Sequence, residues 1–115
     1  MAAIQPRAAA VLIVRDGALV TLDPNDVKVI QFDWDTDNLA SGVGITTSTF
    51  TITTLRGAAT LAKDSESIVT GARSTQLRLS TPTLGALYRI DNKIVTNESP
   101  AQTIDRHFKV LGQNK

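Results

Sequence analysis

The chain has 115 residues, of which 42% are hydrophobic and 20% are charged, and it contains no cysteine. This length fits one domain with its own core, and the lack of cysteine excludes disulfides, thiolate catalysis and cysteine-ligated zinc. Twelve basic and eleven acidic residues give a formal charge of +1, which provides no general attraction for nucleic acid or anionic lipid. We therefore expect neither nucleic acid nor a membrane among the partners.

The first 21 residues differ in character from the rest of the chain. The apolar run from Ala8 to Val14 is too short to span a bilayer, and no small-residue cleavage site follows it as in a secretory signal. Asp16-Gly17 comes next and is a favoured two-residue turn of a β-hairpin. We predict either a hairpin that belongs to the domain or an extended arm that pairs with a neighbouring subunit.

From residue 27 onward, five segments alternate apolar and polar residues, as strands with one buried face do. Threonine fits a pleated backbone and is abundant among them, most clearly in GITTSTFTITT. No amphipathic stretch is long enough for the crossover helices of a parallel sheet, so we expect antiparallel sheets. The predicted strands are residues 27–34, 47–52, 75–80, 87–96 and 102–110.

The alternation also predicts where the aromatic side chains lie. All five fall on the inward faces of these strands, so we expect no exposed aromatic cleft of the kind that binds glycans. They are Phe32, Trp34, Phe50, Tyr88 and Phe108.

Turn-forming sequences separate the strands. Pro and Gly mark residues 23–26 and 81–85, and NESP at residues 97–100 is predicted to close a hairpin. The only helical candidate is a single turn at residues 35–41. Residues 53–75 alternate weakly and carry mixed charge, as an interaction loop or an edge strand does. Turn signals at intervals of about 8–14 residues are typical of a β-sandwich or a small barrel.

The sequence QFDWDTDN raises the question of a cation site, because it places aspartates at alternate positions, Asp33, Asp35 and Asp37. An EF-hand loop that started at Asp33 would need Gly at its sixth position and Glu at its twelfth. Asn38 and Gly44 stand there instead. We interpret the stretch as a strand end followed by a turn, with a different oxygen-rich cation site as the less favoured alternative.

No combination of residues predicts catalysis. His107 is the only histidine, and no nucleophile motif accompanies it, so we expect it on the surface. Arg106 shares the inward face of its strand and is predicted to pair with Asp91 or Asp105 or to extend past the core edge, with an interface role as the alternative. We therefore expect no enzymatic activity, no metal and no cofactor.

The order of residues from Leu22 onward carries a more specific signal. LDPND is followed by the strand end DW and then by LASGVGITTSTFTI, and the second half contains GALYRIDNKIVT. This order resembles a family of small virion proteins of tailed bacteriophages, usually described as fibre–tail adaptors. The matching residues are Asp23, Pro24, Asp26, Val27, Asp33, Trp34, Leu39, Ala40, Gly42, Ile45, Ser48, Thr49, Phe50, Thr51, Ile52, Gly85, Tyr88, Ile90, Ile94 and Thr96.

The resemblance implies an antiparallel immunoglobulin-like β-sandwich that works in the virion and is made in the host cytoplasm. It implies a non-enzymatic adaptor in the tail or neck, with capsid decoration as the alternative role. Two features depart from the family: LRLSTPTLG replaces a segment with Trp and a double Gly, and the N-terminal residues lie outside the match. The expected division is an arm or hairpin at 1–21, the sandwich at 22–112 and a tail at 113–115.

Expected partners are other virion proteins of the tail, neck or fibre, or alternatively the major capsid protein, together with further copies of the chain. We expect contacts in the apolar N-terminal run and in the segment 53–75. The predicted contact residues are Val11, Leu12, Ile13, Val14, Arg56 and Arg73.

Overall fold

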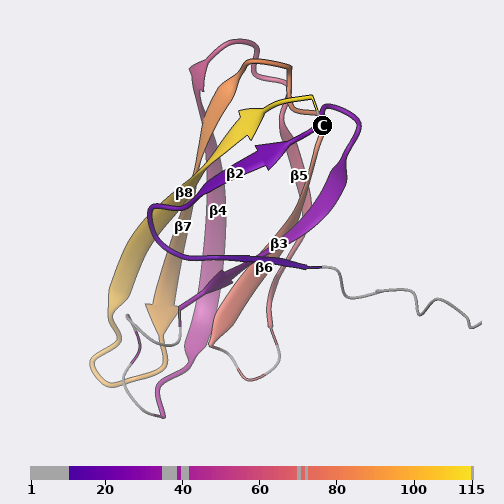
Figure 1. The fold of residues 1–115 in the computed structure, drawn as a ribbon. Helices are drawn as coiled ribbons and strands as arrows, with labels where there is room; N and C mark the ends of the chain where they lie inside the picture. Colours follow the sequence, from indigo (N-terminus) through magenta and orange to yellow (C-terminus); the bar gives the residue numbers. More distant parts are fainter. Residues whose placement is uncertain (1–10, 35–38, 40–41, 70, 72, 115) are drawn as a thin grey trace, which may run out of the picture.

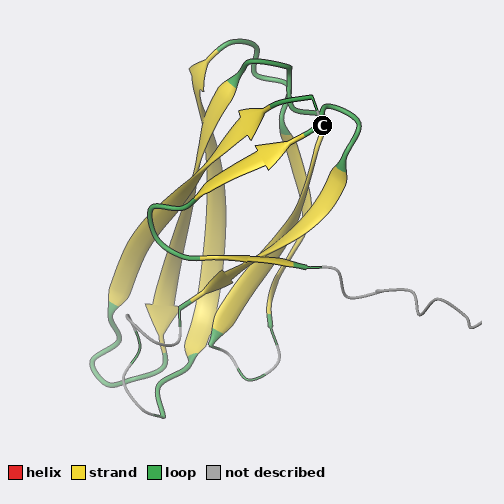
Figure 2. Cartoon of the chain, viewed as in Figure 1, coloured by secondary structure: helices red, strands yellow, loops and turns green. Residues whose placement is uncertain are grey.

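The computed structural model describes residues 11–34, 39, 42–69, 71 and 73–114, which form eight β-strands and no helix. The strands build two four-stranded sheets that face each other (Figures 1 and 2). The prediction of an all-β sandwich is confirmed. The first sheet has the order β1 (Leu12–Val14), β3 (Val27–Asp33), β6 (Ser74–Ser80) and β5 (Ala62–Ile68). The second sheet has the order β2 (Leu19–Leu22), β8 (Thr103–Gly112), β7 (Leu87–Thr96) and β4 (Ile45–Arg56).

The N-terminal strands correct two predictions. The turn at Asp16-Gly17 forms, with Gly17 at a φ of 82° and Ala18 N–H donating to the Arg15 carbonyl at 3.0 Å. However, β1 and β2 do not pair with each other as in a hairpin. Instead, β1 pairs in parallel with β3, and β2 pairs in parallel with β8. Both sheets are therefore mixed, because the chain crosses from one sheet to the other between β1 and β2.

This arrangement explains how parallel pairs form without the helices that we expected to be necessary. A parallel pair needs a connection that returns the chain to its starting end. Between β1 and β3 that connection is β2 in the opposite sheet, and between β2 and β8 it is the rest of the sandwich. The other four paired neighbours are antiparallel, as predicted.

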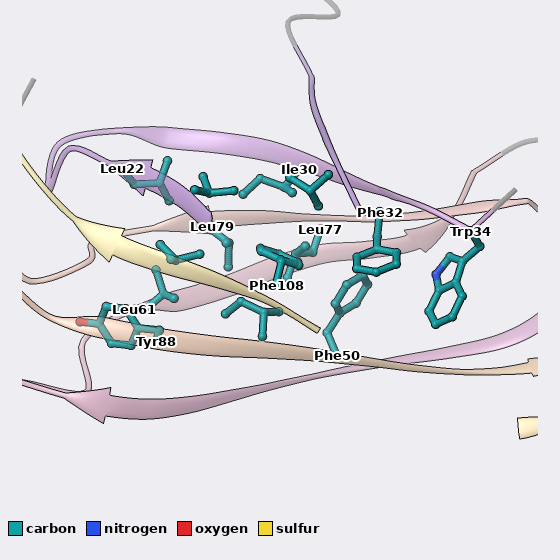
Figure 3. Packing of buried hydrophobic residues seen from close by; sticks show 14 of the residues in the cluster. Leu22, Ile30, Phe32, Trp34, Phe50, Leu61, Leu77, Leu79, Tyr88 and Phe108 are labelled. Atoms are coloured by element: carbon teal, nitrogen blue, oxygen red, sulfur yellow. The ribbon is translucent and has the colours of Figure 1, made fainter. Parts of the chain in front are cut away.

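The core lies between the sheets and contains the inward residues that the alternation predicted. All five aromatic side chains are buried, including Trp34 and Tyr88 with no exposed surface (Figure 3). The ring centroids of Phe32 and Trp34 are 4.9 Å apart, and those of Phe32 and Phe108 are 6.1 Å apart. Such tilted ring pairs add to the free energy gained by burying apolar surface.

A buried polar network crosses the core from one sheet to the other. The indole Nε1 of Trp34 donates to Asn92 Oδ1 at 2.9 Å, and the hydroxyl of Thr75 donates to the same oxygen. Asn92 Nδ2 donates to Ser48 Oγ at 2.8 Å and to the Thr49 carbonyl at 3.2 Å. The network therefore joins β6 and the residue that follows β3, on the side of the first sheet, to β7 and β4 of the second. In the described part of the chain, every buried side-chain nitrogen and oxygen has a hydrogen-bond partner.

At the opposite end of the core, Tyr88 connects two loops. Its hydroxyl donates to the Ala58 carbonyl at 2.6 Å and accepts from the Thr83 N–H at 3.1 Å. Beside it, Thr60 Oγ1 donates to the Thr81 carbonyl at 2.9 Å. These bonds hold the β4–β5 loop against the β6–β7 loop.

Candidate functional site

The described residues offer neither a pocket for a small ligand nor a group of three potential metal ligands. No helix in that part of the chain is long and apolar enough to cross a membrane. Asp33 belongs to the end of β3, and its carboxylate forms an ion pair with Arg15 at 3.2 Å. The strand-end interpretation holds for Asp33, whereas Asp35, Asp37 and most of the predicted helical turn lie outside the described residues.

His107 and Arg106 lie on β8, and both take part in hydrogen bonds that involve backbone groups of this strand. The His107 N–H donates to Asp16 Oδ1 at 3.1 Å, and the Gly17 N–H donates to the His107 carbonyl at 2.8 Å. The imidazole Nδ1 of His107 lies 3.9 Å from the same Asp16 oxygen. Arg106 donates to the Asp105 carbonyl at 2.9 Å, rather than to a carboxylate. The histidine thus helps to fix the β1–β2 turn against β8.

The predicted N-terminal contact residues divide between core and surface. Val14 is 5% exposed and packs in the core, because it lies opposite Phe32 on the inward face of the first sheet. Ile13 is 60% exposed on the outward face, and Leu12 is partly exposed at the sheet edge. Val11 precedes the strand and is half-buried. Of these four residues, therefore, only Leu12 and Ile13 have side chains that are exposed to solvent.

Arg56 and Arg73 lie at opposite ends of the sandwich and do not form one site. Arg56 ends β4, is exposed, and donates from Nε to the Gly85 carbonyl at 3.3 Å. Arg73 precedes β6 and is half-buried, with Nη1 donating to the Val43 carbonyl at 2.6 Å and Nη2 donating to the Leu39 carbonyl at 3.2 Å. Arg73 holds the entry to β4 in place, whereas Arg56 is accessible.

Exposed leucines gather at the end of the second sheet where β8 ends. Leu111 lies opposite Leu87 across the sheet, and Leu55 occupies the irregular step of β4 next to Leu87. Leu84 in the β6–β7 turn lies three positions before Leu87, and Leu19 on β2 is paired with Lys109, two positions before Leu111. Leu19, Leu55 and Leu84 are 60%, 47% and 55% exposed. Apolar surface of this kind marks interaction sites more often than scattered single residues do. We call these five leucines the leucine patch.

The four sheet edges differ in how well they are protected against another strand. On one side of the sandwich, β1 and β2 are only three and four residues long. On the other side lie β5 and β4. β5 carries Lys63, Asp64 and Glu66, and it bulges at Ser65, whose φ is 55°. Short strands, charges and bulges all discourage edge pairing, so these three edges are protected.

β4 has none of these protections over most of its length. It is the longest strand, with 12 residues, and Thr46–Thr54 contains neither a charge nor a proline. Its register with β7 is continuous from Thr47 to Thr54, between two irregular steps. Thr47, Thr49, Thr51 and Thr53 are exposed and point away from the core. The alternation around Phe50 predicted Thr49 and Thr51 to be outward, but only the sheet order shows that these threonines lie on an edge.

The prediction for residues 53–75 allowed either an interaction loop or an edge strand, and residues 62–68 form the edge strand β5. The polar network around Asn92 was missed. Its signal was present, since Asn92 occupies an inward position between Ile90 and Ile94 in an alternating strand.

Comparison with known proteins gives one family and one fold. Residues 22–111 match the family model described as podophage GP4 fiber-tail adaptor protein gp77. No curated protein matches the chain. Among solved structures, the cysteine protease inhibitor EhICP2 from Entamoeba histolytica is similar, with a TM-score of 0.51 and 14% identity over 90% of this chain and 95% of that one. At this identity the likeness concerns the fold alone.

Proposed function

The chain belongs to the family of podophage GP4 fiber-tail adaptor proteins, and from this membership we propose that it connects fibre and tail components of a virion through protein–protein contacts. The observation that carries the proposal is the extent of the family match, which runs from Leu22, the last residue of β2, to Leu111, one residue before the end of β8. In this role the protein is structural and catalyses no reaction. It is made in the host cytoplasm and acts in the virion.

The geometry supports a docking role. The aromatic side chains fill the core, so the surface that remains for recognition consists of outer sheet faces, edges and loops. The leucine patch is the candidate contact on the second sheet, and Arg56, which pairs with Leu87 and donates to the Gly85 carbonyl, supplies a guanidinium at its rim. Buried apolar centres with polar rims are typical of protein interfaces. Ile13 provides a second exposed apolar side chain, on the outer face of the first sheet, and Leu12 is accessible at the edge of that sheet.

We further propose that the sandwich is immunoglobulin-like. In the constant-type arrangement one sheet has strands A, B, E and D and the other has C, F and G. The orders β1-β3-β6-β5 and β2-β8-β7-β4 correspond to these sheets if the first strand is split between them. Tyr88 supports the correspondence, because it lies near the start of the sixth strand of that scheme and its hydroxyl binds Thr83, five residues upstream.

Direct localisation tests the proposed role. Electron microscopy of virions labelled with antibody against this chain is expected to place it where fibres join the tail. Label on the capsid shell would favour capsid decoration instead and would overturn the adaptor proposal.

Binding to purified virion proteins tests the proposed contact. The double substitution Leu55→Asp/Leu84→Asp is expected to abolish binding to fibre or tail protein, because it places two carboxylates in the leucine patch. The matched control Ser67→Asp alters the exposed face of β5 and is expected to bind normally. Equal binding by both variants would exclude the leucine patch as the contact.

A further inference from the structure

The free edge of β4 carries a pattern that fits a second copy of the same strand. Centred on Phe50, the sequence TTSTFTITT of Thr46–Thr54 reads nearly the same in both directions, and only Ser48 and Ile52 break the symmetry. An antiparallel pair of identical strands related by a two-fold axis also reads the same in both directions. We propose that two copies of the chain pair through β4, antiparallel and centred on Phe50, so that the second sheets join into one eight-stranded sheet.

In this register each exposed threonine meets a threonine of the second copy. Thr49 lies opposite Thr51, and Thr47 lies opposite Thr53, each on both sides of the axis. Directly opposed threonines on one face of an antiparallel pair stabilise it through contacts and hydroxyl hydrogen bonds. The bulge-free part of β4 begins at Thr47 and ends at Thr54, so it contains the whole symmetric run from Thr47 to Thr53. The backbone is therefore regular where the pairing requires it.

The charges on the neighbouring strand are compatible with the same register. In β7, Lys93 lies opposite Thr49 and Asp91 lies opposite Thr51. Across the proposed interface, Lys93 of one copy and Asp91 of the other therefore flank the same pair of threonines. They are separated by three strand spacings, about 14 Å, so their attraction is weak. No like charges face each other along these two rows, and the paired segment Thr47–Thr53 contains no charged residue.

The contrast with β5 is what favours a paired state for β4. Both are edges on the same side of the sandwich, but β5 carries charges and a bulge along its middle, whereas the middle of β4, from Thr47 to Thr54, carries neither. A long, uncharged, regular edge is a template for strand addition, and proteins that remain monomeric usually block such edges. A strand from a fibre or tail protein would also fit the backbone, but it would not require β4 to be symmetric. The symmetry therefore favours a second copy as the occupant.

This inference goes beyond the proposed function and makes specific the expectation from the sequence that the chain contacts further copies of itself. It is tested without any other virion protein. Sedimentation velocity of the full-length chain from about 1 µM to about 1 mM is expected to show a reversible dimer, since small interfaces dissociate in this range. A monomer at every concentration would overturn the proposal and leave the adaptor role untouched. Conversely, failure to bind fibre or tail protein would not alter the dimer.

Two double substitutions at the same positions test the register. Thr49→Lys/Thr51→Lys places like charges opposite each other twice and is expected to weaken dimerisation at least about tenfold. Thr49→Glu/Thr51→Lys places opposite charges there and is expected to dimerise at least as well as the unchanged chain. Both changes lie on the exposed outward face, and thermal unfolding checks that each variant is folded. Equal dimerisation of the two variants would overturn the proposed register.

A matched control and a distance measurement complete the test. Ser67→Lys adds a charge to the β5 edge and is expected to leave the dimer unchanged. Loss of the dimer in this variant would contradict the proposal that β4 forms the contact. Because the chain has no native cysteine, Thr51→Cys and Thr53→Cys can each carry a single spin label. The label-to-label distance is expected to be shorter at position 51 than at position 53, where the two copies are offset by about 20 Å along the strand. The reverse order would contradict pairing centred on Phe50.

Discussion

At one end of the core, side chains from both sheets meet in the interior, where Asn92 bonds with Trp34, Thr75 and Ser48. At the other end, the contact is between loops, and the Tyr88 hydroxyl bonds to the backbone at Ala58 and Thr83. Figure 3 shows Trp34 and Tyr88 at opposite ends of the core. The first arrangement removes several polar groups from water, whereas the second lies at the margin of the core. Loss of one partner is therefore expected to cost more in the first case than in the second.

The comparison shows how an adaptor can keep its surface free for partners. Specific polar contacts fix the two sheets against each other at both ends, and apolar side chains fill the space between them. Neither network uses the side chains of the outward threonines of β4 or of the leucine patch. Substitutions on those surfaces are therefore expected to change binding without unfolding the sandwich.

Substitution of Asn92 is expected to have the largest effect. Asn92→Leu keeps a similar volume but removes the oxygen that accepts from Trp34 Nε1 and the Thr75 hydroxyl and the amide that donates to Ser48, so that Trp34 Nε1 keeps only its 3.2 Å bond to Thr75 Oγ1. We expect the free energy of unfolding to fall by about 3–5 kcal/mol, because each orphaned buried group costs about 1–3 kcal/mol. Urea denaturation followed by circular dichroism measures the change. The control Lys93→Leu alters the adjacent outward position and is expected to cost far less; similar losses in both variants would show that the network does not stabilise the fold.

A substitution at Gly112 tests the Tyr88 end of the core, because the β6–β7 turn packs closely against the backbone of Gly112. A Cβ at Gly112 would lie 2.0 Å from the Thr83 carbonyl oxygen, and the Gly112 N–H and carbonyl bond to Ala86 and Gly85 at 2.9 and 2.8 Å. Gly112→Ala is therefore expected to force the β6–β7 turn away from β8 and to lower the free energy of unfolding by about 2–3 kcal/mol. Thermal unfolding of this variant beside Gln113→Ala, which changes an exposed side chain, measures the loss. A stable Gly112→Ala protein would mean that the turn moves without cost.

Tyr88→Phe is expected to have a smaller effect, because it keeps the ring and removes only the hydroxyl. The Thr83 N–H and the Ala58 carbonyl lose their partner, but both lie in loops near solvent. We expect a loss of about 1–2 kcal/mol in the free energy of unfolding. Amide hydrogen exchange is expected to quicken at Thr83 and in the β4–β5 loop while β3 and β6 stay protected. Faster exchange throughout the first sheet would contradict a local role for the hydroxyl.

The inward faces of the strands could be predicted from the sequence because burial imposes a period of two. Phe32, Phe50 and Phe108 are buried as that pattern requires. Asn92 obeys the same rule, yet a polar residue at an inward position reveals a network only when its partners are known. Trp34 and Asn92 are 58 residues apart, so no local pattern connects them.

Pairing between distant strands was the part that the sequence could not provide. The turn at Asp16-Gly17 suggests a hairpin, but contacts with β3 and β8 outweigh that local preference and direct its flanking strands to different sheets. The sequence of β5 left two predictions open, an interaction loop or an edge strand, because an edge strand has few inward apolar residues and so shows little alternation. The positions of the predicted contact residues also depend on strand pairing that the sequence does not reveal. Arg56 and Arg73 are only 17 positions apart, yet antiparallel pairing places them at opposite ends of the sandwich.

The ion pair between Asp64 and Arg78 lies outside both networks and is expected to have the smallest effect. Arg78 donates to the Asp64 carboxylate from Nε at 2.8 Å and from Nη2 at 2.9 Å, and both side chains are largely exposed. The hydrogen bond from Arg78 holds the pKa of the Asp64 carboxyl below its ordinary value. A lowered pKa in the folded state means that the pair stabilises β5 against β6 above the unfolded-state pKa of about 3.9, and that this contribution disappears as the pH falls through the folded-state pKa.

An NMR titration of the Asp64 carboxyl carbon measures that pKa directly, and Arg78→Gln is expected to return it toward the ordinary value. The change in stability of the whole protein is expected to be small, because water and salt screen an exposed pair. A large acid-induced loss that Asp64→Asn removes would show that the β5 edge depends on this pair more than on its backbone hydrogen bonds. In that case the exposed ion pair would contribute as much to the stability of the protein as the buried network around Asn92.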